Sequence, residues 1–394
     1  MSRAAPDVVE DLATLVRFPT VSSRPNLALI AWLAERCEAL GFTIERFEDP
    51  EETGKATLIC RVGPDDADGL VLSGHTDVVP TEGQPWTSDP FRLTAREGRL
   101  HARGSADMKG FVAATLVGLA ELPLRNLRRQ LVLVWTHDEE IGCRGSAKLA
   151  AAMRARDARL PSACWIGEPT GMRLLRRHAG HVAMELRCSG QAAHSAYPEL
   201  GANALVAACR LADAAVAAGP ALAEAARASG DPTGRVPLNI ASLHAGDAIN
   251  IVPDAATLRL GFRPPPGCGH EPFVTTLDDA FAGAALPAGT RFEREVLRVT
   301  PSLRTARGTT LEGWLTPHLA PADDDCAGFA TDGGNLALLG CEPLIFGPGR
   351  IEVAHQADEY VEEAELRHAV TVVRDVVGRS MREAQAAPGS LSSR

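Results

Sequence analysis

Short, nearly wholly apolar runs alternate with stretches whose apolar residues recur at helical spacing in the first part of the chain. The apolar runs predict strands buried on both faces, and the periodic stretches predict amphipathic helices. The predicted strands span residues 42–47, 56–62, 69–73, 130–136 and 163–166. The predicted helices span residues 8–16, 26–40, 108–122 and 146–156. This alternation predicts an α/β fold, with a mostly parallel sheet and helices on both faces.

The pattern changes near Arg173. Residues 181–188 alternate apolar with more polar side chains, which is typical of a half-buried antiparallel strand. The elements predicted beyond it are an Ala-rich helical stretch at 203–227, strands at 238–243 and 256–262, and a helix at 272–281. Together they predict a second α+β unit that is inserted into the first.

The inserted unit divides the predicted α/β domain in two. Pro287 and Gly289 mark the return to that domain, although residues 291–299 fit either domain. The return segment contains a predicted strand at 343–346 and a closing helix at 361–384. The predicted division is residues 1–175 for the first part of the α/β domain, 176–290 for the inserted unit, 291–386 for the second part, and 387–394 for a disordered tail.

Composition excludes several classes of function. The net charge of −10 and the absence of a Lys/Arg run argue against nucleic-acid binding. The first ten residues have no apolar signal core and no apolar run reaches 18 residues, so we expect neither export nor a membrane partner. The nine cysteines are scattered and form no C-x-x-C pair, which predicts free thiols in a reducing cytoplasm.

Polar groups follow the predicted buried strands directly. His75 and Asp77 follow the strand at 69–73, and ligands of open α/β sheets bind at the carboxyl ends of the strands. The other polar residues in such places are Glu139 and Glu140 after a strand, Glu168 after the next, Asp107 at a helix start and His355 in a Gly/Pro-flanked loop. Imidazoles mixed with carboxylates suit zinc, cobalt or manganese, and this number of ligands suits two metal ions about 3.5–4 Å apart.

Glu139 and Glu140 are the most informative pair. Neighbouring side chains diverge, so one carboxylate would bind metal while the other holds the attacking water and removes its proton. Each residue taken alone also has a local explanation, as a solvated strand end, an N-cap or a loop charge. The repetition of polar clusters at successive strand ends favours one shared site.

The motifs resemble those of the dinuclear zinc deacylases and carboxypeptidases of the aminoacylase, carboxypeptidase and acetylornithine deacetylase superfamily. The shared motifs are SGHTDVVP at 73–80, GSADMKG at 104–110, DEEIG at 138–142, GEPT at 167–170, QAAHSAYPELGANA at 191–204 and AHQADE at 354–359. Within that superfamily the chain is most similar to the acetylornithine deacetylases. The segments that carry this closer similarity are 19–33, 85–104 and 346–360.

The resemblance implies a role for each motif residue. His75 and Glu168 would hold one metal, and Glu140 and His355 the other. Asp107 would bridge the two metals and is usually followed by a cis peptide in the family.

The resemblance also assigns the residues that act on the bound water. Asp77 would orient His75. Glu139 would be the general base and then the acid that protonates the leaving amine.

In the family, the histidine that corresponds to His194 reaches the active site of a partner subunit and stabilises the oxyanion. We therefore expect a homodimer formed through roughly residues 176–289. Arg263 and Asn250 match family positions associated with the substrate carboxylate or the oxyanion. The further candidates for substrate binding are Tyr197, close to His194, and the backbone N–H groups of Gly347 and Gly349.

The resemblance implies hydrolysis of an N-acyl amino acid by two zinc ions, with cobalt as an alternative. N-acetyl-L-ornithine, cleaved to L-ornithine and acetate in arginine biosynthesis, is the leading substrate. The alternatives are succinyl-diaminopimelate, acetylcitrulline or a dipeptide, and a non-catalytic homologue on the same fold. His178, His137 and the segment 141–144 depart from common family patterns, which leaves the acyl group and the amino-acid side chain open.

Overall fold

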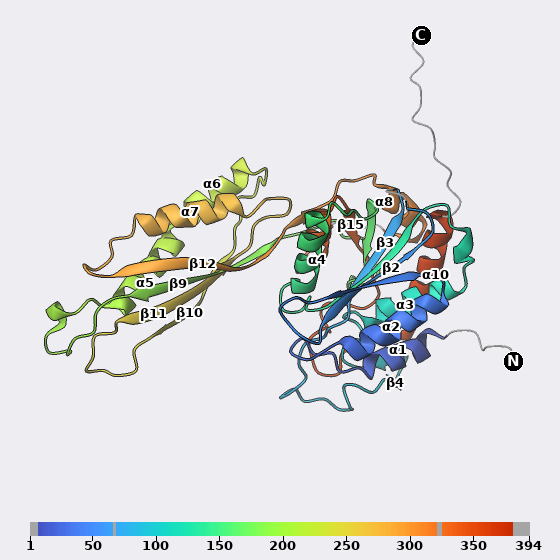
Figure 1. Cartoon of the computed structure of the whole chain (residues 1–394), viewed down its shortest axis with the longest axis horizontal. Helices are drawn as coiled ribbons and strands as arrows, with labels where there is room; N and C mark the ends of the chain where they lie inside the picture. The colour runs from blue at the N-terminus through green and yellow to red at the C-terminus, as the bar shows by residue number, and fades with distance from the viewer. Residues whose placement is uncertain (1–6, 66–67, 321–324, 381–394) are drawn as a thin grey trace, which may run out of the picture. The chain divides into compact units, whose positions relative to one another are not determined.

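The chain divides into two units in the computed structural model, which describes residues 7–65, 68–320 and 325–380 (Figure 1). Unit 1 comprises the described residues up to Arg176, Thr305–Cys326 and those from Thr331 onward. Unit 2 comprises Arg177–Arg304 and Ala327–Ala330. The inserted unit therefore ends near residue 304 and not at the predicted residue 290. The predicted tail at 387–394 lies outside the described residues.

Unit 1 contains a six-stranded sheet in the order β1-β2-β6-β3-β7-β15. The strands are β1 Thr43–Glu48, β2 Ala56–Val62, β6 Leu131–Thr136, β3 Leu70–His75, β7 Ala163–Ile166 and β15 Glu342–Ile345. The last four of this order pair in parallel, whereas β1 and β2 add an antiparallel edge. The expected mostly parallel sheet is confirmed.

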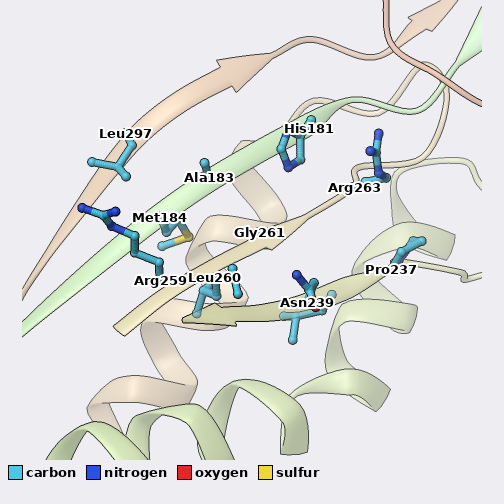
Figure 2. Close-up of a pocket in the computed structure, with 12 residues that line it drawn as sticks. His181, Ala183, Met184, Pro237, Asn239, Arg259, Leu260, Gly261, Arg263 and Leu297 are labelled. Carbon is cyan, nitrogen blue, oxygen red and sulfur yellow. The ribbon is translucent and has the colours of Figure 1, made fainter. Parts of the chain in front are cut away.

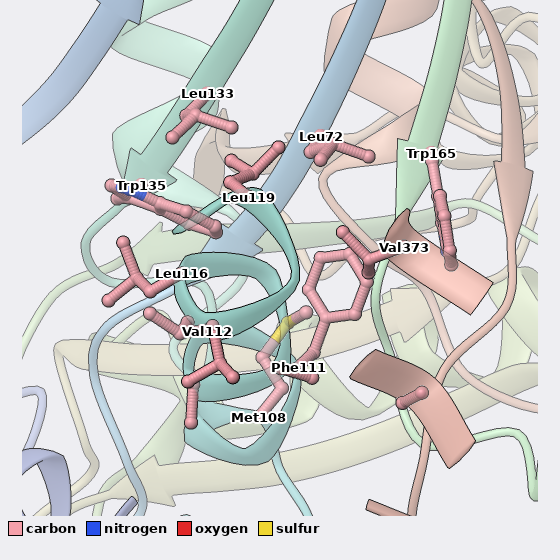
Figure 3. Packing of buried hydrophobic residues seen from close by; sticks show 14 of the residues in the cluster. Leu72, Met108, Phe111, Val112, Leu116, Leu119, Leu133, Trp135, Trp165 and Val373 are labelled. Atoms are coloured by element: carbon pink, nitrogen blue, oxygen red, sulfur yellow. The ribbon is translucent and has the colours of Figure 1, made fainter. Parts of the chain in front are cut away.

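Helices cover both faces of this sheet. One face carries α1 Val8–Val16, α2 Leu27–Ala39, α3 Lys109–Ala120, α8 Thr310–Leu315 and α10 Glu363–Ser380. The other carries α4 Arg144–Ala155 (Figure 1), which contacts α9 Gly333–Ala337. Because α3 lies between the sheet and α10, it is apolar all round and almost entirely buried. Figure 3 shows Phe111 of α3 beside Trp165 of β7, with ring centroids 5.4 Å apart.

A small three-stranded sheet joins two distant segments of unit 1. Its strands are β4 Thr94–Arg96, β5 Arg99–His101 and β16 Tyr360–Glu362, in the order β16-β5-β4. The turn between β4 and β5 is Glu97-Gly98, with both residues at positive φ. Tyr360 pairs with His101, so the segment after His355 lies beside the segment before Asp107.

Unit 2 is an antiparallel sheet in the order β10-β11-β9-β12. Its strands are β9 His181–Ser189, β10 Leu238–Ala245, β11 Ala255–Phe262 and β12 Arg291–Thr300. Alternate residues of β9, from Val182 to Cys188, are buried under α5 Ala204–Ala217, α6 Gly219–Ala228 and α7 Glu271–Ala282. The strand β12 pairs with β9 along its length. Because many charged residues lie on its open face, this strand is difficult to recognise from the sequence.

The remaining elements are short. They are β8 Arg177–His178, β13 Leu303–Arg304, β14 Cys326–Ala327, and 3₁₀ turns at Leu124–Asn126, Pro198–Leu200 and Thr316–His318. Among the described residues no single helix is long and apolar enough to cross a membrane, and only the bent pair α5 and α6 passes by length and composition.

Candidate functional site

The carboxyl ends of β6, β3 and β7 lie side by side in the sheet of unit 1. β3 ends at His75, Glu139 and Glu140 follow β6, and Glu168 follows β7. Because these strands are parallel neighbours, the polar residues that follow them meet at one edge of the sheet. Gly167 permits this convergence, since a Cβ at that position would lie 1.9 Å from a ring carbon of Phe111.

The motif residues form two overlapping groups of potential ligand atoms. His75, Asp107 and Glu140 form one group, and His75, Glu139 and Glu168 form the other. In each group the ligand atoms lie within 4.8 Å of one another. The convergence predicted from the sequence is therefore present.

His75 is oriented from both sides of its ring. Its Nδ1 lies 2.9 Å from the backbone oxygen of Asp77, and its Nε2 lies 2.9 Å from Oδ1 of Asp107. If Nδ1 donates to this carbonyl, Nε2 keeps a lone pair directed at Asp107, which is the tautomer that a metal ligand needs.

The carboxylate of Asp77 acts mainly on another part of the site. Its nearer oxygen lies 3.6 Å from His75 Nδ1, so the backbone oxygen is the closer partner of that ring. The two carboxylate oxygens accept hydrogen bonds from the backbone N–H groups of Glu139 and Glu140, at 3.1 and 3.2 Å. Ser22 donates a further bond at 2.7 Å. Asp77 thus positions the Glu139-Glu140 turn as well as His75.

Asp107 lies between the two imidazoles. Its Oδ1 faces His75, and its Oδ2 lies 3.2 Å from Nε2 of His355. The same His355 nitrogen lies 2.8 Å from Oε2 of Glu140. The peptide between Asp107 and Met108 is cis, as the family resemblance implies. His355 is the exposed member of the cluster, with about half of its side chain accessible, so the site opens to solvent there.

Glu139 lies within 4.8 Å of the ligand atoms of His75 and Glu168 and also contacts a thiol. Its carboxylate accepts a hydrogen bond from the thiol of Cys143 at 3.2 Å. Burial raises the pKa of Glu139 well above its ordinary value, and the charges of Asp332 and Glu140 add to the effect. A buried carboxyl with a raised pKa is suited to accept and return a proton.

The cluster carries more buried negative charge than its imidazoles can balance. Burial raises the pKa of Glu140 to about 7 and that of Glu168 well above its usual range. Although burial opposes it, the hydrogen bond to Asp107 raises the pKa of His75. Buried carboxylates at such spacing need cations. The donor set of imidazoles and carboxylates therefore fits divalent metal ions.

Sequence reasoning missed the second layer behind Glu139. Asp332 is buried and accepts hydrogen bonds from the hydroxyls of Thr136 and Ser146. Asn335 donates to the backbone oxygen of Cys143 at 3.1 Å and so fixes the turn that carries the thiol. The signal in the sequence was the polar run from Thr331 to Asn335, to which no function was assigned.

Unit 2 brings three predicted residues together. His194 forms an isolated antiparallel β-bridge with Ile251, and Ser195 donates its N–H to the backbone oxygen of Asn250 at 3.0 Å. The ring centroids of His194 and Tyr197 are 6.4 Å apart. Nδ1 of His194 accepts the N–H of Ala196 at 3.0 Å, so in the neutral ring Nε2 carries the proton. His194, Tyr197 and Asn250 are all exposed.

Arg263 lies elsewhere in unit 2, at a pocket of about 440 Å³ on the sheet face that α5–α7 do not cover (Figure 2). His181 and Asn239 line the same pocket, along with apolar residues such as Ala183 and Leu297. Burial, together with the charges of Arg298 and Arg263, lowers the pKa of His181 to about 4. His181 is therefore neutral near pH 7, and the positive charge at this pocket comes from Arg259 and Arg263.

The two predicted glycines have their N–H groups paired within the chain. Gly347 donates to the hydroxyl of Thr170 at 3.1 Å, and Gly349 donates to the carboxylate of Glu365. A Cβ on Gly347 would lie 2.3 Å from the backbone oxygen of Gly167. The structure thus gives these glycines a packing role beside Glu168, and neither N–H is free for a substrate.

The family whose sequence pattern matches residues 71–379 is described as peptidase family M20/M25/M40. An acetylornithine deacetylase from Myxococcus xanthus is 34% identical over 388 residues, which cover 96% of this chain and 98% of that protein. An acetylornithine deacetylase from Erwinia tasmaniensis is 30% identical over 388 residues, with the same two shares of 96% and 98%.

Solved structures share the fold. A tripeptidase from Staphylococcus aureus superposes with a TM-score of 0.71 at 19% identity, over 95% of this chain and 98% of that one. A dinuclear metal-binding peptidase of the M20 family from Bacillus subtilis gives a TM-score of 0.64 at 15% identity, over 95% of this chain and 97% of that one.

Proposed function

We propose, from the premise that the chain belongs to peptidase family M20/M25/M40, that it removes the acyl group from an N-acyl amino acid. N-acetyl-L-ornithine is the preferred substrate of this proposal, with L-ornithine and acetate as products. Membership of the family makes the chain a metal-dependent hydrolase. The observation that carries the reaction is the buried cluster in which Glu139 lies beside the ligand atoms of His75 and Glu168. The relatives named acetylornithine deacetylase support the substrate.

Five residues are proposed to hold two divalent ions, zinc in the first place and cobalt as an alternative. His75 and Glu168 form one ligand pair, Glu140 and His355 form the other, and Asp107 lies between them. Ions bound there would polarise the acyl carbonyl and lower the pKa of a water molecule.

The side chains of the chain then move the proton and hold the charge. Glu139 accepts a proton from the attacking water, whose oxygen bonds to the acyl carbon. The C–N bond breaks, and Glu139 returns the proton to the leaving amine nitrogen. Nε2–H of His194 donates a hydrogen bond to the oxyanion of the tetrahedral intermediate. Arg263 and Asn250 are the proposed contacts for the free carboxylate of the substrate or for the oxyanion, and Tyr197 is the proposed contact for the rest of the substrate.

His194 is proposed to serve the active site of a partner subunit in a homodimer. Exposed apolar side chains support an interface on unit 2, because they gather on the two loops around His194. They are Tyr197, Leu200, Ile249 and Ile251. Nine free cysteines support a cytoplasmic location for the enzyme.

Mixed subunits test the shared site. Glu139→Gln and His194→Ala chains each have strongly reduced activity in this scheme, but a hybrid dimer contains one site with an intact base and a donated His194. After unfolding and joint refolding we expect activity to rise well above that of either variant refolded alone. If the mixture is as inactive as the separate variants, or if light scattering finds a monomer at micromolar concentration, the shared site is wrong.

The substrate is tested by amine release from N-acetyl-L-ornithine, N-succinyl-diaminopimelate, N-acetylcitrulline and a dipeptide, with and without chelator. We expect chelator-sensitive turnover with the highest kcat/KM on N-acetyl-L-ornithine. A higher kcat/KM on another of these amides would correct the substrate and keep the reaction. No cleavage of any amide by the zinc- or cobalt-loaded chain would favour the non-catalytic homologue.

A further inference from the structure

A buried ion pair connects the two segments that carry Asp107 and His355. Arg103 and Glu359 are about 1% exposed, and Nη1 of Arg103 lies 2.6 Å from Oε2 of Glu359. Arg103 precedes Asp107 by four residues, and Glu359 follows His355 by four residues. Each member of the pair therefore belongs to the segment of a different candidate ligand.

Each residue of the pair contacts the segment to which the other residue belongs. Oε1 of Glu359 accepts the backbone N–H groups of Ala106 and Asp107, at 3.0 and 3.1 Å. Nη1 of Arg103 also reaches the backbone oxygen of Gln356 at 3.3 Å. The pair thus acts as a cross-brace, in which Glu359 fixes the backbone of Asp107 and Arg103 fixes the backbone after His355.

Gln84 extends the brace to His355 itself. Its Oε1 accepts a hydrogen bond of 2.6 Å from Nη2 of Arg103, and its Nε2 donates to the backbone oxygen of His355 at 2.8 Å. The two segments also meet through their candidate ligands, since Nε2 of His355 lies 3.2 Å from Oδ2 of Asp107.

We propose that Arg103, Glu359 and Gln84 are positioning residues that preorganise Asp107 and His355 for the two metal ions. This inference rests on the metal centre of the proposed function. Residues that orient metal ligands from behind affect metal affinity even though they do not touch the ion. Because Asp107 lies between the two imidazoles, a change at Glu359 loosens both ions. Because Gln84 bonds directly to the backbone of His355 but reaches the Asp107 segment only through Arg103, a change there loosens the ion at His355.

The paired strands β5 and β16, which adjoin Arg103 and Glu359 in the sequence, provide a matched control. Arg99 on β5 pairs with Glu362 on β16 at 2.9 Å, but both side chains are more than 40% exposed and neither contacts a ligand segment. Arg99→Gln removes an ion pair between these adjoining strands and leaves the contacts of Arg103, Glu359 and Gln84 in place.

The test measures zinc release from the full-length, zinc-loaded chain to a chromogenic chelator, together with the unfolding temperature of the metal-free chain. We expect Gln84→Ala to release one of the two ions about 10- to 100-fold faster than the wild type and to leave the other unchanged. Glu359→Gln should accelerate the release of both ions, and Arg99→Gln should match the wild type. Gln84→Glu, which keeps the acceptor for Arg103 but cannot donate to His355, should behave like Gln84→Ala.

Wild-type release rates in Gln84→Ala and Gln84→Glu would overturn the proposal. So would a lower unfolding temperature of the metal-free variants without faster release, because that result describes a purely structural brace. Replacing Gln84 leaves no buried charge unpaired. The zinc release rates of the Gln84 variants therefore test the proposal even if Glu359→Gln fails to fold. A wild-type chain that binds no zinc would contradict the metal centre itself, and the brace proposal would fall with it.

Discussion

The motif residues of unit 1 and those of unit 2 differ in how completely the fold surrounds them. In unit 1, His75, Asp107 and Glu168 are buried at one sheet edge and contact one another or share a ligand group. In unit 2, His194 and Arg263 are exposed, and the His194 loop is fixed chiefly by backbone hydrogen bonds. A site built from strand ends is complete within one unit, whereas exposed loop residues need a substrate or a partner to complete them.

Metal removal should have the largest effect, and its effect should differ between the two units. Dialysis against a chelator should abolish amide hydrolysis and lower the unfolding temperature of unit 1, because the buried carboxylates then repel one another without cations. Unit 2 contains no comparable cluster among its described residues and should unfold at an unchanged temperature. Calorimetry with and without added zinc measures both. An equal shift of both transitions would contradict the comparison.

Glu139→Gln should come next. The amide cannot accept the proton of the attacking water, so kcat should fall about 10²- to 10⁴-fold. The metal content should stay at the wild-type value, because Glu139 is not among the proposed ligands. Steady-state kinetics and elemental analysis on the same preparation test this prediction. Loss of metal along with activity would show that Glu139 is a ligand and not the base.

His194→Ala should have a smaller effect and should act through unit 2. The loss of one oxyanion donor is expected to lower kcat about 10²- to 10³-fold with little change in the metal content. His244→Ala is the control, since it removes another exposed histidine of the same unit. Comparable kcat in both variants would remove His194 from the catalytic scheme.

The smallest effect is a pH dependence confined to unit 2. Burial lowers the pKa of His178 to about 4, whereas its value in an unfolded chain is about 6.5. Between these values the unfolded chain binds a proton that the folded chain excludes. The contribution of His178 to the free energy of unfolding should therefore fall as the pH drops from 6.5 to 4, by at most about 3 kcal/mol, and this contribution should not change further below that range. The loss should be smaller in His178→Gln, and equal slopes in denaturant titrations of both chains would contradict the assignment.

The sequence predicts the strand ends of unit 1 well because buried parallel strands are short, apolar and end in conspicuous polar groups. His75, Glu139 and Glu168 were found from this pattern, and the fold brings them together as expected. Asp332 and Cys143 were missed because their importance depends on contacts between distant segments. A buried Asp in a polar run looks like a surface turn until its partners are known.

The boundary of unit 2 was misplaced for a related reason. The strand β12 alternates charged residues with Phe292 and Val296, and its pairing with β9 fixes it in unit 2. A single half-exposed strand at the edge of a sheet does not reveal its partner in the sequence. In the same way, the closing helix begins at Glu363 because Tyr360–Glu362 pairs with β5, which is a long-range contact.

The most direct test of the two-metal hydrolase is a titration of the metal-free chain with zinc, in which amide hydrolysis is measured at each molar ratio. The proposed site predicts that activity rises until two zinc ions are bound per chain, that Glu139→Gln binds the same two ions without activity, and that His355→Ala binds only one tightly. Full activity without added metal, or two tightly bound ions in His355→Ala, would contradict the account.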